Sequence, residues 1–282
     1  MSHDEPTSEV PTETRRMTST NSAAEAAPSD FKIQELTLDH PWSWLARGWS
    51  DLRHAPLPSL GYGLIFVLAG YALFAVIVYA ELFYLLLPLL SGFFLVGPVA
   101  AVGLYEISRR HERGQPVSLG HALGAWRANG GQIAVFGMVL MLVFIAWMQL
   151  VMLIFALLHQ GVTPTWESFV RVVFLQPDSF PLLLAALLLG GVLATIVFAM
   201  SALAVPLLMD RTINALDAMR LSVQAVRRNA RPMLLWATII AAFTGIGLVT
   251  FLLGLLVMLP LIGHATWHAY RDTLGHQQMN RQ

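Results

Sequence analysis

The stretch FFLVGPVAAVGLYEISRRHERG, residues 93–114, carries an apolar helix with Pro98 directly into a polar end that includes Glu106 and Arg109. The same pattern occurs twice more along the chain. In the second copy Pro206 is followed by Asp210 and Arg211. In the third copy Pro260 is followed by His264, Trp267, His268 and Arg271. We therefore expect three apolar segments to leave a membrane through charged residues, all on one side.

The composition is that of an integral membrane protein. Hydrophobic residues make up 56% of the chain and charged residues 12%, with a mean hydropathy of +0.62, whereas a soluble domain carries about 25% charged residues. At about 20 apolar residues per crossing, a chain of 282 residues has room for about six membrane spans. The absence of cysteine excludes disulfides, iron–sulfur clusters and thiolate zinc sites.

The two ends of the chain are polar. Residues 1–30 consist mainly of Ser, Thr, Glu, Pro and Ala without an apolar block, which is typical of a disordered segment. We expect a disordered cytoplasmic tail at 1–30, a membrane domain at 31–274 and a short cytoplasmic tail at 275–282. The apolar core of a secretory signal is missing near the start, so the first span is expected to act as its own insertion signal.

A short amphipathic helix is predicted at about 41–53, with Asp39 as its cap and Pro56 after its end. It is too short and too charged to cross a bilayer, and its tryptophans favour the headgroup region. We therefore expect it to lie in the membrane interface. The predicted apolar face is Trp42, Leu45, Trp49 and Leu52, and the residues placed elsewhere on the helix are Arg47, Asp51 and Arg53.

Two later segments repeat this interfacial pattern. One is capped by Ser118, and the other begins near Asn214 with Asp217 in the position of a capping box. Their predicted apolar faces are Leu119, Ala122, Leu123 and Trp126 in the first, and Leu216, Met219, Val223 and Val226 in the second. AWRAN at 125–129 and AVRRN at 225–229 match at an offset of 100 residues. We infer an internal threefold repeat of one interfacial helix followed by one helical hairpin.

The repeat predicts an all-α, polytopic membrane fold with six transmembrane helices in three hairpins. Its last apolar run is long for one span and short for two, so we interpret it as a hairpin that turns near 245–250. The predicted spans are 60–79, 82–106, 133–158, 181–209 and the two halves of 233–262. Every Lys and Arg except Arg171 then lies on one side, a positive-inside pattern that places both termini in the cytoplasm.

Four segments resemble a known family. They are HPWSWLARGWSDL from His40, LVGPVAAVGLYEISRR from Leu95, MLLW from Met233 and LPLIGHATWHAYRD from Leu259. Together they resemble the bacterial predicted integral membrane proteins grouped as domain of unknown function 2189, over about residues 40–274. The resemblance implies a six-helix protein of the inner membrane without an established activity. Some members carry a cytochrome oxidase subunit label, which implies histidine ligands that the sequence can test.

The histidines do not fit a haem–copper catalytic subunit, which needs several histidine ligands on different helices. Only His264 and His268 lie near a predicted span. Spaced at i and i+4, they point the same way from one helix, and a single haem or metal site is possible with help from Glu106 or Asp210. Alternatively they are interfacial histidines beside Trp267, in the aromatic belt.

The three exits predict a second candidate site. If the repeats pack around a pseudo-threefold axis, ionisable side chains from the three exits form a ring at the cytoplasmic mouth. The predicted members are Glu106, Arg109, Asp210, Arg211, His268 and Arg271. Ionisable groups close to a membrane are often functional. The alternative is that these side chains sit at span ends, where charge costs little, and anchor the topology.

The sequence leaves three classes of function open. No phosphate loop, dinucleotide fingerprint, zinc-protease helix or nucleophile elbow is present, so we expect no enzyme activity. The favoured interpretation is a non-enzymatic scaffold or accessory subunit at the cytoplasmic leaflet. The alternatives are a small-solute or lipid transporter or channel, with a polar path from Gln149 to the ring, and a haem- or metal-binding respiratory accessory using His264 and His268.

The expected partners follow from the same residues. The lipid bilayer is the first, and the arginine clusters at 109–113 and 227–231 suit anionic lipids. A membrane protein complex is a further expected partner, whereas nothing in the chain indicates nucleic-acid binding. No cofactor is expected apart from the haem or metal of the third function.

Overall fold

The computed structural model of the chain describes residues 31–86, 89, 92, 97–158 and 179–275, and every regular element within these ranges is helical. The predicted tail at 1–30, residues 276–282 and the outer segment 159–178 with Arg171 lie outside the described residues. In chain order the elements are α1 (His40–His54), α2 (Pro56–Tyr79), η2 (Phe83–Leu85), α4 (Val102–Glu112), α5 (Leu119–Gly124), η3 (Ala125–Arg127), α6 (Gly130–Leu158), α8 (Ser179–Ser201), α9 (Ala204–Asp210), α10 (Ala215–Arg228), α11 (Ala230–Val249) and α12 (Leu255–Leu274). The all-α class is therefore confirmed.

Four helical segments of the described chain are long and apolar enough to cross a membrane. They are Pro56–Tyr79, Gly130–Leu153, Leu187–Asp210 and Ala230–Val249. Large apolar side chains stand exposed along α2, α6 and α8, among them Leu68, Leu142 and Leu187. A water-soluble protein does not expose a continuous apolar surface of this kind, so these helices belong in lipid. The predicted second span, 82–106, is described only in part.

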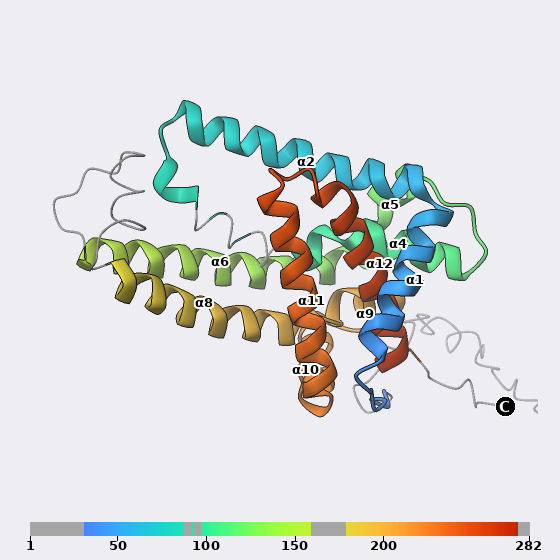
Figure 1. Cartoon of the computed structure of the whole chain (residues 1–282). Helices are drawn as coiled ribbons and strands as arrows, with labels where there is room; N and C mark the ends of the chain where they lie inside the picture. The colour runs from blue at the N-terminus through green and yellow to red at the C-terminus, as the bar shows by residue number, and fades with distance from the viewer. Residues whose placement is uncertain (1–30, 87–88, 90–91, 93–96, 159–178, 276–282) are drawn as a thin grey trace, which may run out of the picture.

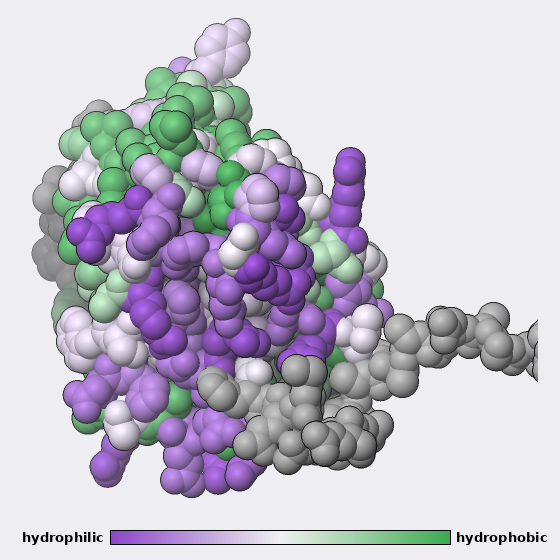
Figure 2. All heavy atoms as spheres, turned by 90° about the vertical axis from the view of Figure 1, so that its right-hand side faces the viewer, coloured by the Kyte–Doolittle hydropathy of each residue, from purple (hydrophilic) through white to green (hydrophobic). Residues whose placement is uncertain are grey.

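Polar and apolar parts of the molecule are separated along its length. In Figure 1, α2, α6 and α8 extend to one end of the molecule, and α1, α4, α9 and the end of α12 gather at the other. Helix α11 is inclined steeply to the long helices in this view. Figure 2 shows hydrophilic side chains concentrated on the end formed by α1, α4 and α12. We refer to this end as the polar end.

Helix α1 packs along α12 and joins the start of the described chain to its end. Its buried face contains Trp44, Gly48 and Asp51, and the Trp44 ring meets Trp236 of α11 edge-on at 5.5 Å between centroids. A methyl group on Gly48 would lie 2.8 Å from the backbone nitrogen of Ala265. The two helix backbones therefore approach closely at Gly48.

The predicted apolar face of this first helix is divided between the surface and the core. Trp42 and Trp49 are 57% and 43% exposed, as an interfacial position requires, but Leu52 of the same face is buried. Asp51, which the sequence pattern placed elsewhere on the helix surface, is only 4% exposed. The reason is that α12 packs against the stripe through Trp44 and Gly48, where small and polar residues allow close contact. Asp39 occupies the cap position but its side chain makes no cap hydrogen bond.

The other two predicted caps are confirmed. Ser118 Oγ accepts a hydrogen bond from His121 N, and the Asn214 side chain accepts one from Asp217 N. The predicted apolar faces are correct only in part. Residues Ala122 and Met219 are buried, but Leu123, Trp126 and Leu216 are exposed, because α5 is short and α10 turns its Ala218 and Ala225 side inward.

The span predicted at 181–209 is interrupted between α8 and α9. The hydroxyl of Ser222, from α10, donates to the Ala199 carbonyl at 2.8 Å and accepts from Leu203 N at 3.2 Å. This side chain takes over the backbone bonds that a continuous helix would make for itself, a known cause of helix breaks. The interruption thereby fixes α10 against α8 and α9.

The predicted turn near 245–250 lies a few residues later. Helix α11 continues to Val249, and α12 starts at Leu255. Phe251 and Leu252 adopt positive φ, and Gly254 N donates to Thr250 Oγ1 at 2.9 Å. The helix extends past the predicted turn because glycines 245 and 247 sit within α11 rather than ending it. Gly247 instead leaves room for the Leu255 side chain.

Replacing Gly48 with alanine is expected to destabilise the protein by about 1–3 kcal/mol, the usual cost of overpacking, because the new methyl group meets the α12 backbone. The control is Gly245→Ala, since a methyl group there meets nothing within 4 Å. Thermal unfolding of the detergent-solubilised variants, followed by helicity, measures both. Equal melting temperatures for Gly48→Ala and the wild type would contradict the close packing of α1 on α12.

Candidate functional site

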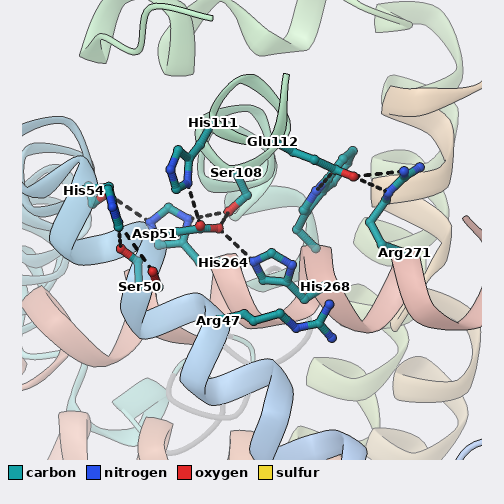
Figure 3. A network of polar contacts seen from close by, with 12 residues as sticks. Arg47, Ser50, Asp51, His54, Ser108, His111, Glu112, His264, His268 and Arg271 are labelled. Carbon is teal, nitrogen blue, oxygen red and sulfur yellow. Dashed lines mark hydrogen bonds and ion pairs between the residues drawn. The ribbon is translucent and has the colours of Figure 1, made fainter. Parts of the chain in front are cut away.

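The candidate site is a cluster of ionisable side chains buried at the polar end. Helices α1, α4 and α12 each supply residues to it, as Figure 3 shows. Its centre is the Asp51 carboxylate of α1, which receives side chains from both other helices. We call this group the Asp51 cluster, and its members are Asp51, Ser59, Ser108, His111, His264 and His268.

The Asp51 carboxylate accepts three hydrogen bonds. Ser108 Oγ donates to Oδ2 at 2.6 Å, and His268 Nε2 donates to the same oxygen at 2.9 Å. His111 Nδ1 donates to Oδ1 at 2.7 Å. Three donors from two neighbouring helices compensate for removing the carboxylate from water, a transfer that is costly when a charge remains unpaired.

The charge state of Asp51 follows from these contacts. Burial by itself disfavours the charged form, but the hydrogen bonds from His268 and Ser108 outweigh burial and lower the pKa of Asp51 from 3.8 to about 2. The carboxylate is therefore ionised at neutral pH. It holds a negative charge at the point where α1 meets α4 and α12.

A chain of hydrogen bonds leads from Asp51 toward the interior. Because Ser108 gives its only hydroxyl proton to Asp51, its oxygen accepts from His264 Nδ1, 2.8 Å away. The other ring nitrogen of His264, Nε2, lies 2.9 Å from Ser59 Oγ of α2. A neutral imidazole, the form that full burial favours, then carries its proton on Nδ1 and accepts from Ser59. The chain runs in one direction, from Ser59 through His264 and Ser108 to Asp51.

The predicted pair His264 and His268 does lie on one side of α12, but the two rings serve different partners. His264 uses both ring nitrogens within the chain of hydrogen bonds, and His268 points Nε2 at Asp51. Within the described residues, no group of three or more His, Cys, Asp or Glu side chains is arranged to hold a metal ion. Both histidines are therefore engaged in contacts within the protein.

A second ionic group surrounds Asp210, at the end of α9. Its carboxylate pairs with Arg113 at 3.0 Å and accepts a hydrogen bond from the Tyr270 hydroxyl at 2.8 Å. Arg271 lies 3.6 Å from Asp210 and 2.9 Å from Glu112. This second group therefore links α4 and α9 to the end of α12.

The remaining predicted members of the ring pair locally. Glu106 binds Arg109 at 2.6 Å within α4, and Arg109 also donates to the Met209 carbonyl at 2.9 Å. Arg211 lies 3.6 Å from Asp210. The predicted set thus divides between two groups. Asp210, Arg211 and Arg271 come together, Glu106 and Arg109 adjoin them, and His268 turns to Asp51.

Sequence reasoning missed four members of the Asp51 cluster. The missed residues are Asp51, Ser59, Ser108 and His111. None of them was a candidate, because the pattern of its own helix gave no sign of a partner on another helix. One signal was available in the first helix. Pro41, Trp44, Gly48, Asp51 and Leu52 recur at helical spacing, and a glycine within such a stripe indicates close approach of another backbone.

The burial of the cluster limits its chemistry. Ser59, Ser108 and His264 are all buried, so a substrate cannot reach either of the two hydroxyls that contact His264. Nucleophilic catalysis requires such access in addition to the hydrogen bond. In this arrangement the cluster holds α1, α2, α4 and α12 together and fixes their rotation.

The Asp51→Asn substitution is expected to lower the free energy of unfolding by about 2 kcal/mol at neutral pH. The reason is that the folded protein holds the pKa of Asp51 at about 2, below the ordinary value of 3.8. Since the folded-state pKa is the lower one, this contribution is present above about pH 4 and disappears as the pH falls toward 2. Melting curves of wild type and variant from pH 7 to acid measure the difference. Asp39→Asn, at an exposed carboxylate next to the same helix, should change little. If the wild type stayed more stable than Asp51→Asn by the same amount near pH 2, the assignment of an ionised Asp51 carboxylate would be wrong.

The chain was compared with known families, curated proteins and solved structures. No curated protein and no solved structure matches it. One family model does match, and its range includes Ser108, His111 and Asp210 but ends before α12. Residues 86–210 match the family described as "Predicted integral membrane protein (DUF2189)", so the family resemblance seen in the sequence is confirmed over this part of the chain.

Proposed function

We propose that the protein is a non-enzymatic scaffold or accessory subunit, held at the cytoplasmic leaflet of the inner membrane. The observation that carries this proposal is that the carboxylates of the polar end find their partners within the protein. Its five main carboxylates, Asp51, Glu106, Glu112, Asp210 and Asp272, all bind side chains of the protein. Such a network stabilises a surface and leaves few polar groups for turnover of a substrate.

The surface so stabilised suits a membrane interface. Trp42 and Trp49 stand exposed on α1, Trp126 on η3, and Leu216 on α10. Tryptophan rings favour the headgroup region, and a helix fixed by its inner face can present them there without further ordering. We interpret these residues as the contact surface for headgroups and for a membrane-bound partner.

The proposed threefold repeat has support in two asparagines at the offset of 100 residues. Asn129 donates to the carbonyls of Leu208 and Ile213, in the segment that precedes α10. Asn229 donates to the Gln34 carbonyl and accepts from Leu36 N, in the segment that precedes α1. Each asparagine thus holds the segment that leads into the next interfacial helix, as a closed ring of three copies requires.

Helix packing supports the same arrangement. Helix α5 packs on α4, α10 packs on α8 and α9, and α1 packs on α12. Each interfacial helix therefore contacts the exit helix of the preceding copy, and the last of these contacts closes the ring between the two ends of the chain. Six spans, with both termini in the cytoplasm, complete this proposal. Arginines of the polar end, including Arg47, Arg113 and Arg271, favour this orientation.

The alternatives receive less support from the geometry. A polar channel would start at Gln149, but this side chain stands exposed on α6 and does not line the cavity between α8 and α11. A haem or metal accessory would use His264 and His268, whose nitrogens bind Ser59, Ser108 and Asp51 instead.

Purification from native membranes in a mild detergent tests the scaffold role. We expect at least one membrane protein to co-purify at fixed stoichiometry, and the double variant Trp42→Ala with Trp49→Ala to lose most of it because the contact surface is removed. Leu68→Ala, at an exposed apolar residue of α2 outside the cavity, is the matched control and should retain the partner. Quantitative mass spectrometry measures the molar ratio of the co-purified partner to this chain. A wild-type preparation that contains only this chain and lipid would overturn the proposal.

A further inference from the structure

We propose that the cavity between α8 and α11 binds one anionic phospholipid of the cytoplasmic leaflet, with an acyl chain inside and the phosphate at Arg227. This inference goes beyond the scaffold role and does not depend on it. The cavity measures about 640 Å³ and is bounded by α8, α10, α11, α12 and the segment from Gly97 to Tyr105. Ligand sites in proteins range over about 300–1,000 Å³, so the space is large enough for a ligand.

The lining of the cavity is chemically suited to hydrocarbon. Small and apolar residues dominate it, including Ala194, Phe198 and Ala241. Three of its four threonine hydroxyls donate to carbonyls of their own helices: Thr195 to Gly191 at 2.8 Å, Thr238 to Leu234 at 2.9 Å and Thr266 to Ile262 at 2.8 Å. A polar solute would find few free partners there, whereas an acyl chain needs none.

The extent of the cavity matches one leaflet. Its wall on α11 runs from Ala230 to Thr244, which is roughly 20 Å of helix at about 1.5 Å per residue. The hydrocarbon of one leaflet is about 15 Å thick, half of the usual bilayer core. Because α11 is inclined to the long helices (Figure 1), the depth of this wall along the direction of those helices is less than its length along α11. A single acyl chain that enters from the polar end therefore fills the cavity without crossing the membrane.

The charge at the mouth selects the headgroup. Arg227 lines the cavity where α10 ends, and Arg231 follows in the first turn of α11. Both side chains are exposed and neither forms an ion pair within the described part of the chain, whereas their neighbour Arg228 pairs with Glu35 at 3.1 Å. Arg227 therefore supplies a cation at the cavity, Arg231 adds a second four residues later, and this charge beside an apolar space matches a lipid phosphate over its acyl chain.

Native mass spectrometry of the detergent-purified protein, with equimolar palmitoyl-oleoyl phosphatidylglycerol and phosphatidylcholine, tests the proposal. We expect one phosphatidylglycerol per chain to be retained in preference to phosphatidylcholine. Arg227→Gln should reduce that preference about fivefold, the effect of losing one cation near a lipid surface. Arg220→Gln, an exposed arginine of α10 away from the cavity, is the charge control.

Occupancy of the cavity itself is tested by filling it. Ala241→Phe should reduce binding of both lipids at least tenfold, and Ala242→Phe, the exposed neighbour that does not line the cavity, should bind as the wild type does. If Ala241→Phe fails to fold, Ala237→Leu fills the same space with a smaller side chain. Equal retention of both lipids by the wild type, unchanged binding by the folded cavity-filling variant, or displacement by millimolar inorganic phosphate would each overturn the proposal.

Discussion

A carboxylate removed from water at the edge of a membrane domain must find donors, and Asp51 finds three of them on two other helices. This constraint determines the arrangement of the polar end. It requires α1 to lie against α12 with one particular face, and it requires α4 to present Ser108 and His111 to the same point. Helices from the beginning, middle and end of the described chain thereby meet at one ionised group.

The helices are closely packed around Asp51 and more widely spaced farther from the polar end. Near Asp51 the backbones of α1 and α12 approach closely at Gly48, and the ionic groups at Asp210 and Glu112 extend the network across α4, α9 and α12. Farther from this end, α8 and α11 stand apart and leave the apolar cavity between them. A rigid polar end with a hydrocarbon-lined space beneath it fits a protein that holds lipid and partners at one leaflet.

The sequence was sufficient for the class of fold because hydropathy and helical period are local properties. Caps such as Ser118 and Asn214 were found for the same reason, since their partners lie three residues away. The Asp51 cluster depends on pairs separated by up to 217 residues, and no local pattern encodes such a pairing. The buried face of α1, with Trp44, Gly48 and Asp51, was missed because its partners on α12 lie more than 200 residues away along the chain.

Single-cysteine labelling tests most directly whether the polar end faces the cytoplasm, and the chain contains no native cysteine to interfere. Leu123→Cys lies at the polar end, and Tyr79→Cys lies at the far end of α2, both at exposed positions. In intact cells a membrane-impermeant maleimide is expected to label Tyr79→Cys and to label Leu123→Cys only after permeabilisation. Labelling of Leu123→Cys from outside, or equal labelling of both positions before permeabilisation, would contradict the account.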